Sequence, residues 1–249
     1  MYQTLALLLL AVSSLSAQSF NRPVPPDFPN FQFSISELAF EGHYCANSYE
    51  LNPATKTNMF LLDAEGYVAW WRKDQEETSN DFKYQPAANA FTSMGYRDEV
   101  GGVFYTYDTE FNAVDTLEAA NGERGDRHEF LLLENGHKII GTLYDTIMDL
   151  SAFTFNGITG LPNSTVRGFG IQEFDAENNL VWTWHSTDFV HPVEFSDGLN
   201  YNANSFDYAH GNSIDLDQDG NLIVSLRNTS TVCKIDRVNR TGNILWRLG

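Results

Sequence analysis

The side chains best suited to chemistry are two histidines and an arginine: His128, His210 and Arg227. His210 and Arg227 flank the sequence DQDG at residues 217–220, which predicts a tight hairpin turn because glycine tolerates positive φ. His210 lies nine residues before Asp219 and Arg227 lies eight residues after it, so a hairpin brings both to one open end. Cross-strand neighbours have Cβ atoms about 5 Å apart, and diagonal ones about 7–8 Å. A histidine and an arginine at that separation can bind one anion between them.

His128 stands in an equivalent position, seven residues before an Asn-Gly turn at residues 135–136. We therefore expect both histidines at the start of equivalent strands, at the same end of different sheets, together with Arg227. A single histidine at a strand end is usually a surface or hydrogen-bonded residue. Two histidines in equivalent places beside an arginine instead favour one anion-binding site. The neighbouring polar residues also suit hydrogen bonds to the loops that enter these strands, so we give them a supporting role at most. These residues are Asp126, Arg127, Asp207, Asn212 and Ser213, of which Asn212 is the additional candidate for substrate binding.

Other kinds of catalytic or metal site find little support. The sequence DLDQDG from Asp215 resembles the start of a calcium loop, but Leu226 stands where that loop requires a glutamate. The chain contains no HExxH motif, no CxxC pair and no GxSxG motif, so a metalloprotease, a structural zinc site and a nucleophile elbow are unsupported. We expect no metal and no cofactor.

Composition and charge limit the partners. The chain has 249 residues, of which 42% are hydrophobic and 14% aromatic, enough for a sizeable core. Its 15 basic and 33 acidic residues give a net charge of −18, which argues against nucleic acid or an anionic membrane as the main partner. Any site for an anion must therefore be built locally, against the overall charge.

The N-terminal part predicts export. Residues 1–17 contain an apolar run too short to span a bilayer, followed by small residues, as in a secretory signal peptide. We therefore expect a secreted or periplasmic protein, with residues 18–30 as a Pro-rich extended lead-in. The two cysteines, Cys45 and Cys233, suit buried thiols in strands, and an oxidising compartment also permits a disulfide between them.

One pattern recurs from residue 31 onward: an alternating strand, an aspartate, a short turn and a second strand that often ends in tryptophan. No convincing amphipathic helix interrupts it. A second type of hairpin lies between the copies, and two hairpins per repeat make the four-stranded blade of a β-propeller. A β-sandwich is the alternative all-β fold. The stretches 144–167 and 185–204 are rich in Gly, Pro and Asn and predict long loops. The copies of the pattern span residues 59–70, 104–114, 171–184 and 232–246.

The final part of the chain resembles the bacterial aryl-sulfate sulfotransferase family. The resemblance rests on Asp207-x-x-His210-x-Asn212-Ser213, then D-x-D-G-N, S-x-R-x-x-S, Asp236 and GNILWRLG. It covers residues 40–249 loosely and 207–249 closely. It implies a six-bladed propeller that moves a sulfuryl group from a phenolic sulfate ester to a phenol, without a nucleotide donor, through a sulfo-histidine. His128, His210 and Arg227 match the family's sulfate-binding and acid–base positions.

The resemblance also implies that residues 31–249 form an incomplete propeller, with about four blades' worth of sequence. We therefore expect an N-terminal fragment whose nucleophilic histidine lies beyond Gly249, and which is itself inactive. Two rival functions remain open: a secreted propeller that binds a ligand or partner without chemistry, and a hydrolase that uses water as the acceptor.

Overall fold

A computed structural model describes residues 18–20, 23–24, 26, 28, 33–35, 41–48, 58–73, 79–155, 157–193 and 205–249. The predicted signal segment 1–17 lies outside these residues, as does part of the Pro-rich lead-in. The chain divides into two compact units, residues 1–44 with 60–71 and residues 45–59 with 72–249. All the candidate site residues belong to the second unit.

Short strands make up the N-terminal part. β1 (Gln18–Phe20) pairs antiparallel with β2 (Phe33–Ile35). A three-stranded sheet follows, with the order β3 (His43–Asn47), β4 (Asn58–Asp63) and β5 (Val68–Lys73).

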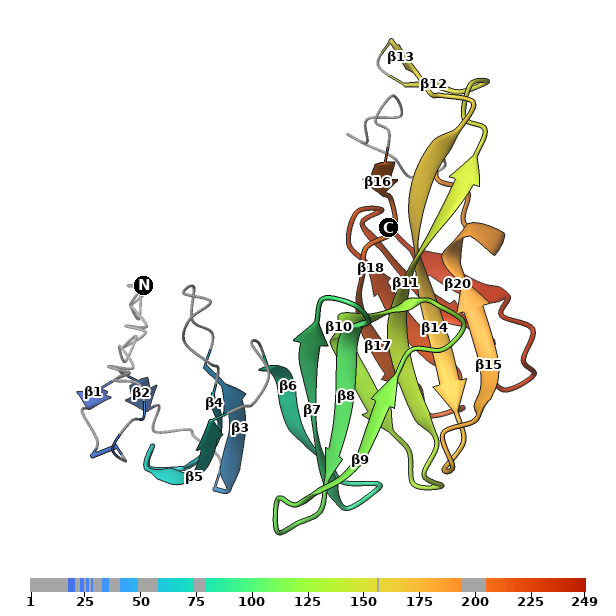
Figure 1. Ribbon diagram of the computed structural model, residues 1–249. Coiled ribbons are helices and arrows are strands. Elements are labelled where there is room, and N and C mark those ends of the chain that lie inside the picture. Colours follow the sequence, from blue (N-terminus) through green and yellow to red (C-terminus); the bar gives the residue numbers. More distant parts are fainter. Residues whose placement is uncertain are drawn as a thin grey trace, which may run out of the picture. The chain divides into compact units, whose positions relative to one another are not determined.

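The second unit contains a nine-stranded sheet and a four-stranded sheet (Figure 1). In the larger sheet the order is β15-β14-β11-β10-β8-β7-β6, with β9 beside β8 and β16 beside β14. Its strands are β6 (Ser79–Gln85), β7 (Ala90–Arg97), β8 (Gly101–Tyr107), β9 (Ala113–Glu118), β10 (Arg124–Leu132), β11 (Lys138–Met148), β14 (Ser164–Phe174), β15 (Leu180–His185) and β16 (Ser205–Asp207). The smaller sheet is an antiparallel meander of β17 (Gly211–Leu216), β18 (Leu222–Leu226), β19 (Thr231–Ile235) and β20 (Ile244–Leu248).

The recurring aspartates are turn residues. Asp108, between β8 and β9, accepts hydrogen bonds from the backbone N–H groups of Glu110 and Asn112 at 2.9 and 2.8 Å. Asp175, between β14 and β15, does the same for residues 177 and 179 at 3.1 and 2.8 Å. A short side chain that accepts hydrogen bonds from the backbone N–H groups of its own turn stabilises the turn without contacts from elsewhere in the fold. The four hairpins predicted from this pattern, β4–β5, β8–β9, β14–β15 and β19–β20, are confirmed.

The fold class is all-β, as predicted. Among the described residues the only helical turn is a 3₁₀ turn, η1 (Ser186–Asp188). The β17–β20 sheet has the four-stranded antiparallel order expected of one blade, whereas the larger sheet runs on through nine strands. None of these sheets closes on itself, so the six-bladed propeller stays a prediction.

The prediction of a loop over residues 144–167 is wrong in part. The antiparallel pairing of β11 with β14 continues through eleven residue pairs, as far as Met148 and Ser164. Its backbone hydrogen bonds outweigh the local Gly and Asn content. The tip of this long hairpin carries the small strands β12 (Thr154–Phe155) and β13 (Ile158–Thr159). In the second predicted loop, residues 194–204 lie outside the described part of the chain.

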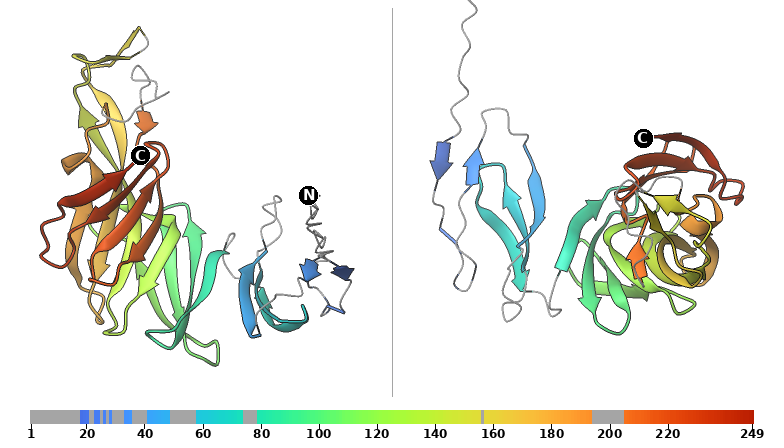
Figure 2. Two further views of the ribbon diagram at one scale, coloured as in Figure 1. Left: turned by 180° about the vertical axis from the view of Figure 1, so that it is seen from behind. Right: turned by 90° about the horizontal axis from the view of Figure 1, so that it is seen from above.

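The core joins the two sheets of the second unit. Buried side chains of β11, β14 and β15, including Phe169 and Trp184, pack with those of β17, β18 and β19, including Ile214 and Val224. Figure 2 shows the four-stranded sheet lying against this part of the larger sheet. This packing fixes the open end of the β17–β18 hairpin against β10 and β14.

The two cysteines are free thiols in strands. Cys233 in β19 is fully buried, and burial raises the pKa of its thiol to about 11. Cys45 in β3 is only half-buried, so the prediction of two buried thiols is correct for one of them. In the described ranges we found no helix long and apolar enough to cross a membrane.

Candidate functional site

The turn at residues 217–220 places His210 and Arg227 side by side. Gly220 adopts a φ of +83°, and Leu216 pairs with Leu222 directly behind the turn. At the open end of the hairpin, the backbone N–H of Arg227 donates to the carbonyl of His210 at 2.9 Å. The predicted hairpin and the adjacency of its two end residues are confirmed.

Asp207 orients the imidazole of His210. Its two carboxylate oxygens accept from the backbone N–H of His210 at 3.0 Å and contact Nδ1 at 2.6 Å. His210 has a φ of +47°, an uncommon conformation for a residue with a side chain, which costs about 1–2 kcal/mol. Because the carboxylate needs a proton on Nδ1, Nε2 remains for a ligand.

His128 is held in the same way by Asp126, which is almost fully buried. One carboxylate oxygen of Asp126 accepts from the backbone N–H of His128 at 3.0 Å and contacts Nδ1 at 2.7 Å. The hydrogen bond to Asp126 is the main cause that raises the pKa of His128 above its usual value. Partial burial and the positive charges of Arg127 and Arg227 act in the opposite direction.

The strand position of His128 differs from the prediction. β10 begins at Arg124, so His128 lies inside the strand and not at its start. It occupies an irregular stretch in which the pairing with β11 jumps from Gly125 to Phe130. Such a bulge bends the strand and changes the direction of its side chains, and here it carries both Asp126 and His128.

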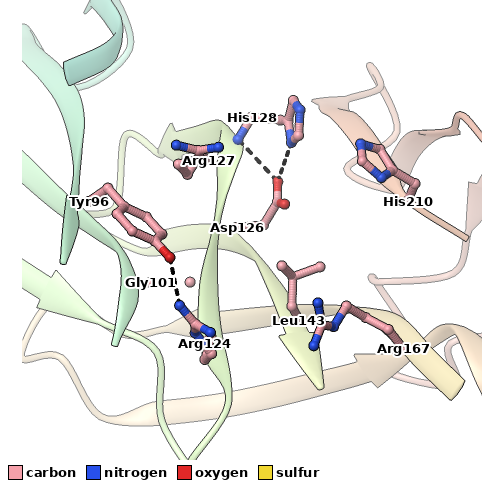
Figure 3. Close-up of a pocket in the computed structure, with 10 residues that line it drawn as sticks. Tyr96, Gly101, Arg124, Asp126, Arg127, His128, Leu143, Arg167 and His210 are labelled. Atoms are coloured by element: carbon pink, nitrogen blue, oxygen red, sulfur yellow. Dashed lines mark hydrogen bonds and ion pairs between the residues drawn. The ribbon is translucent and has the colours of Figure 1, made fainter. Parts of the chain in front are cut away.

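The two histidines lie together. Their ring centroids are 5.6 Å apart with an interplanar angle of 64°. Figure 3 shows them beside a cavity of about 200 Å³. The lining residues come from β7, β8, β10, β11 and β14 and from the start of the β17–β18 hairpin: Tyr96, Gly101, Arg124, Gly125, Asp126, Arg127, His128, Leu143, Arg167 and His210.

Glycines let β8 and β10 approach closely beneath this cavity. Gly101 and Gly125 pair in parallel register. A Cβ on Gly125 would lie 2.2 Å from the carbonyl oxygen of Gly102, which is closer than any side chain tolerates. The absence of side chains at these positions therefore sets where Asp126, Arg127 and His128 lie.

Arg227 and Asn212 lie near the histidines in different ways. The guanidinium of Arg227 is exposed, has no carboxylate partner among the described residues, and is near enough to lower the pKa of His128 by its charge. Asn212 is exposed in the irregular stretch between Gly211 and Ser213 and does not line the cavity. Arg227 does not line the cavity either. The structure therefore brings His128 and His210 together at the cavity, places Arg227 beside His210 outside the lining, and leaves Asn212 at the margin.

Sequence reasoning missed three polar side chains of the cavity, those of Tyr96, Arg124 and Arg167. No motif marks them, because each reaches the cavity only through strand pairing. It also gave Asp126 and Asp207 only a loop-stabilising role. The signal that would have identified their second role is spacing, since each aspartate precedes its histidine by two or three residues.

The remaining polar candidates serve structure. The carboxylates of Asp217 and Asp219, which suggested a calcium loop, both pair with Lys234. His137 contacts the buried Glu173 at 2.8 Å, and His185 contacts Glu123 at 2.7 Å. In the described ranges no group of three or more His, Cys, Asp or Glu side chains is arranged to hold a metal ion.

Replacing Asp126 by asparagine is expected to lower the pKa of His128, because the hydrogen-bonded carboxylate is the main cause of its elevation. An NMR titration of the His128 ring measures this directly. Since the wild-type pKa lies above the unfolded value, the pair stabilises the fold fully below pH about 6.5 and loses this contribution as pH rises through the folded pKa. The control is Asp145→Asn, which removes an equal charge from the partner of Arg167. An equal change in both variants would contradict the specific role of Asp126.

One comparison with known proteins agrees with the family resemblance. The model of a family described as arylsulfotransferase (ASST) matches residues 35–249. No curated protein matches the chain. Among solved structures, a protein of unknown function from Bacteroides caccae matches with a TM-score of 0.45 and 12% sequence identity. The match covers 77% of this chain and 53% of that one, so the chain spans about half the length of that structure.

Proposed function

This chain belongs to the arylsulfotransferase family, and we propose that His128, His210 and Arg227 bind the sulfate ester of an aryl sulfate whose sulfuryl group passes to a phenol. One observation carries the proposal. Two imidazoles, each held at Nδ1 by an aspartate, lie 5.6 Å apart next to an arginine that has no carboxylate partner among the described residues. When the rings are protonated, each Nε2–H is a donor, and together with the guanidinium they present N–H donors to one anion.

Electrostatics support an anion at this position. The chain carries a net charge of −18, yet the cavity is lined by Arg124, Arg127, Arg167 and two histidines against a single carboxylate, that of Asp126. An arginine offers forked donors that fit sulfate oxygens, and a protonated histidine adds a charge-assisted hydrogen bond. The hydrogen bond to Asp126 raises the pKa of His128, which increases the protonated fraction of the ring at a given pH and suits it as the proton donor.

The chemical step follows from these positions. As the bond between sulfur and the aryl oxygen breaks, its electron pair stays on the oxygen, which takes a proton from Nε2 of His128. The sulfuryl group passes to a nucleophile. In the second half, the acceptor phenol returns a proton to His128 and its oxygen forms the new bond to sulfur. The bond between sulfur and the nucleophile breaks at the same time, and its electron pair returns to the nucleophile. Such acid–base help is worth roughly 10²–10⁴-fold in rate, while Arg227 and His210 hold the sulfate oxygens.

A covalent sulfo-histidine between the two halves is part of this proposal, as in the two-step scheme of nucleophilic catalysis. We assign the nucleophile to no residue of this chain. The partners proposed are a small aryl sulfate and a phenol, without nucleic acid or membrane, in a protein exported to the periplasm or the medium.

Binding tests the proposal independently of turnover. Calorimetric titration of the chain is expected to show that phenyl sulfate binds at least about tenfold more tightly than phenol, because one charge-assisted hydrogen bond is worth roughly 1.5–3 kcal/mol. The affinity should fall as pH rises through the raised pKa of His128, since deprotonation removes the Nε2 proton. Equal affinity for phenol and phenyl sulfate would overturn the sulfate site.

A further inference from the structure

The cavity extends beyond the two histidines to a second cationic region. Arg124 and Arg127 of β10 lie on the side of Tyr96, whereas His210 lies on the opposite side (Figure 3). Asp126 and His128 lie between these ends in the same view. We refer to Tyr96, Arg124 and Arg127 as the arginine subsite.

The two arginines of the subsite have uncompensated charges. Arg124 donates to the hydroxyl of Tyr96 at 2.7 Å and to the backbone carbonyl of Asp98 at 3.2 Å. The guanidinium of Arg127 lies over the ring of Tyr96, 4.9 Å from its centroid. Within the described part of the chain, neither arginine pairs with a carboxylate. Arg167 differs, because Asp145 holds it with two hydrogen bonds of 2.9 and 3.1 Å.

Tyr96 adds a donor to the subsite. Its hydroxyl oxygen accepts from Arg124, so its own proton is left to donate to another group. Tyr96 and Arg124 therefore offer converging O–H and N–H donors to a single acceptor. Two positive charges in a protein with a net charge of −18 make a negatively charged acceptor the favoured ligand.

We propose that the arginine subsite binds a carboxylate on the ring of the aryl substrate, and so selects acidic phenols and their sulfates. This inference rests on the proposed function, because the histidine end holds the sulfate ester while the ring spans the cavity. A cavity of about 150 Å³ is enough to hold benzene, and this one measures about 200 Å³, which suits one substituted ring. The arginine subsite thus determines specificity and takes no part in bond breaking.

The test compares two ligands that differ only in the carboxylate. Calorimetric titration of the chain is expected to give an affinity for 4-sulfooxybenzoate about tenfold higher than for phenyl sulfate, as expected for one additional charge-assisted hydrogen bond. Arg124→Gln and Arg127→Gln should each bring this ratio close to one. The ratio is the readout, because losing either positive charge also acts on phenyl sulfate, in Arg127→Gln partly through the pKa of His128. Tyr96→Phe removes only the hydroxyl and should reduce the ratio in part.

Arg97→Gln is the matched control. Arg97 lies next to Tyr96 on β7, pairs with Glu118 at 3.1 Å and does not line the cavity. The variant removes the same charge and should keep the tenfold ratio. Retained phenyl sulfate binding in the Arg124 and Arg127 variants shows that their fold is intact.

The possible failures are distinguishable. If the wild-type chain binds phenyl sulfate but shows no preference for 4-sulfooxybenzoate, the arginine subsite is wrong and the proposed function stands. If neither aryl sulfate binds, the proposed function fails, and the subsite fails with it. A preference that Arg97→Gln also abolishes would show a general charge effect and overturn the subsite.

Discussion

Arg227→Gln is expected to weaken phenyl sulfate binding by roughly 10- to 100-fold, because a charge-assisted contact to sulfate contributes roughly 1.5–3 kcal/mol. The guanidinium is exposed beside His210 and His128 and has no carboxylate partner among the described residues, so its removal leaves no buried charge behind. Arg227→Lys keeps the charge but loses the forked donors, and should therefore bind with intermediate affinity. Calorimetric titration measures all three proteins.

A second measurement separates direct contact from an indirect effect of charge. The positive charge of Arg227 lowers the pKa of His128, so Arg227→Gln should raise that pKa in an NMR titration. More protonated His128 alone would strengthen the binding of an anion. A rise in the pKa together with a loss of affinity therefore indicates that Arg227 itself contacts the sulfate. Unchanged affinity in Arg227→Gln would remove this residue from the site.

Gly125→Ala is expected to lower the stability of the fold and to disrupt the site. The new Cβ would lie 2.2 Å from the carbonyl oxygen of Gly102 and 2.9 Å from its Cα, and these backbone atoms belong to a paired strand. Overpacking of this kind costs about 1–3 kcal/mol, which corresponds to a fall in melting temperature of roughly 2–12 °C. Because β10 must shift away from β8, phenyl sulfate affinity should fall in the same variant.

Gly122→Ala, three residues earlier, provides the comparison. It has open space around its Cβ position and a φ of +75°, so alanine there suffers only the backbone strain of about 1–2 kcal/mol. Thermal unfolding of this variant should show some loss of stability, whereas its affinity for phenyl sulfate should match the wild type. If Gly125→Ala also keeps its full affinity, the close approach of β8 and β10 is not what positions the site.

Sequence patterns were reliable where the interactions are local. The turns at Asp108, Asp175 and Gly220 each satisfy their hydrogen bonds within about five residues, so their hairpins could be predicted from turn chemistry. The adjacency of His210 and Arg227 followed from one such turn. The Gly and Asn content of residues 144–167 misled the prediction, since the long ladder between β11 and β14 supplies hydrogen bonds that outweigh local turn preference.

The sequence by itself therefore determined the all-β class, the hairpins, and the pairing of His210 with Arg227 at one hairpin end. The sequence also predicted that His128 shares this site with His210. Only the tertiary structure decided how closely the two rings meet, that Asp126 and Asp207 orient them, and that Tyr96 and Arg124 face the same cavity. The reason is physical. A turn depends on the conformations of a few adjacent residues, whereas the meeting of β10 with β17 depends on the joint packing of two sheets and on the close approach of β8 to β10.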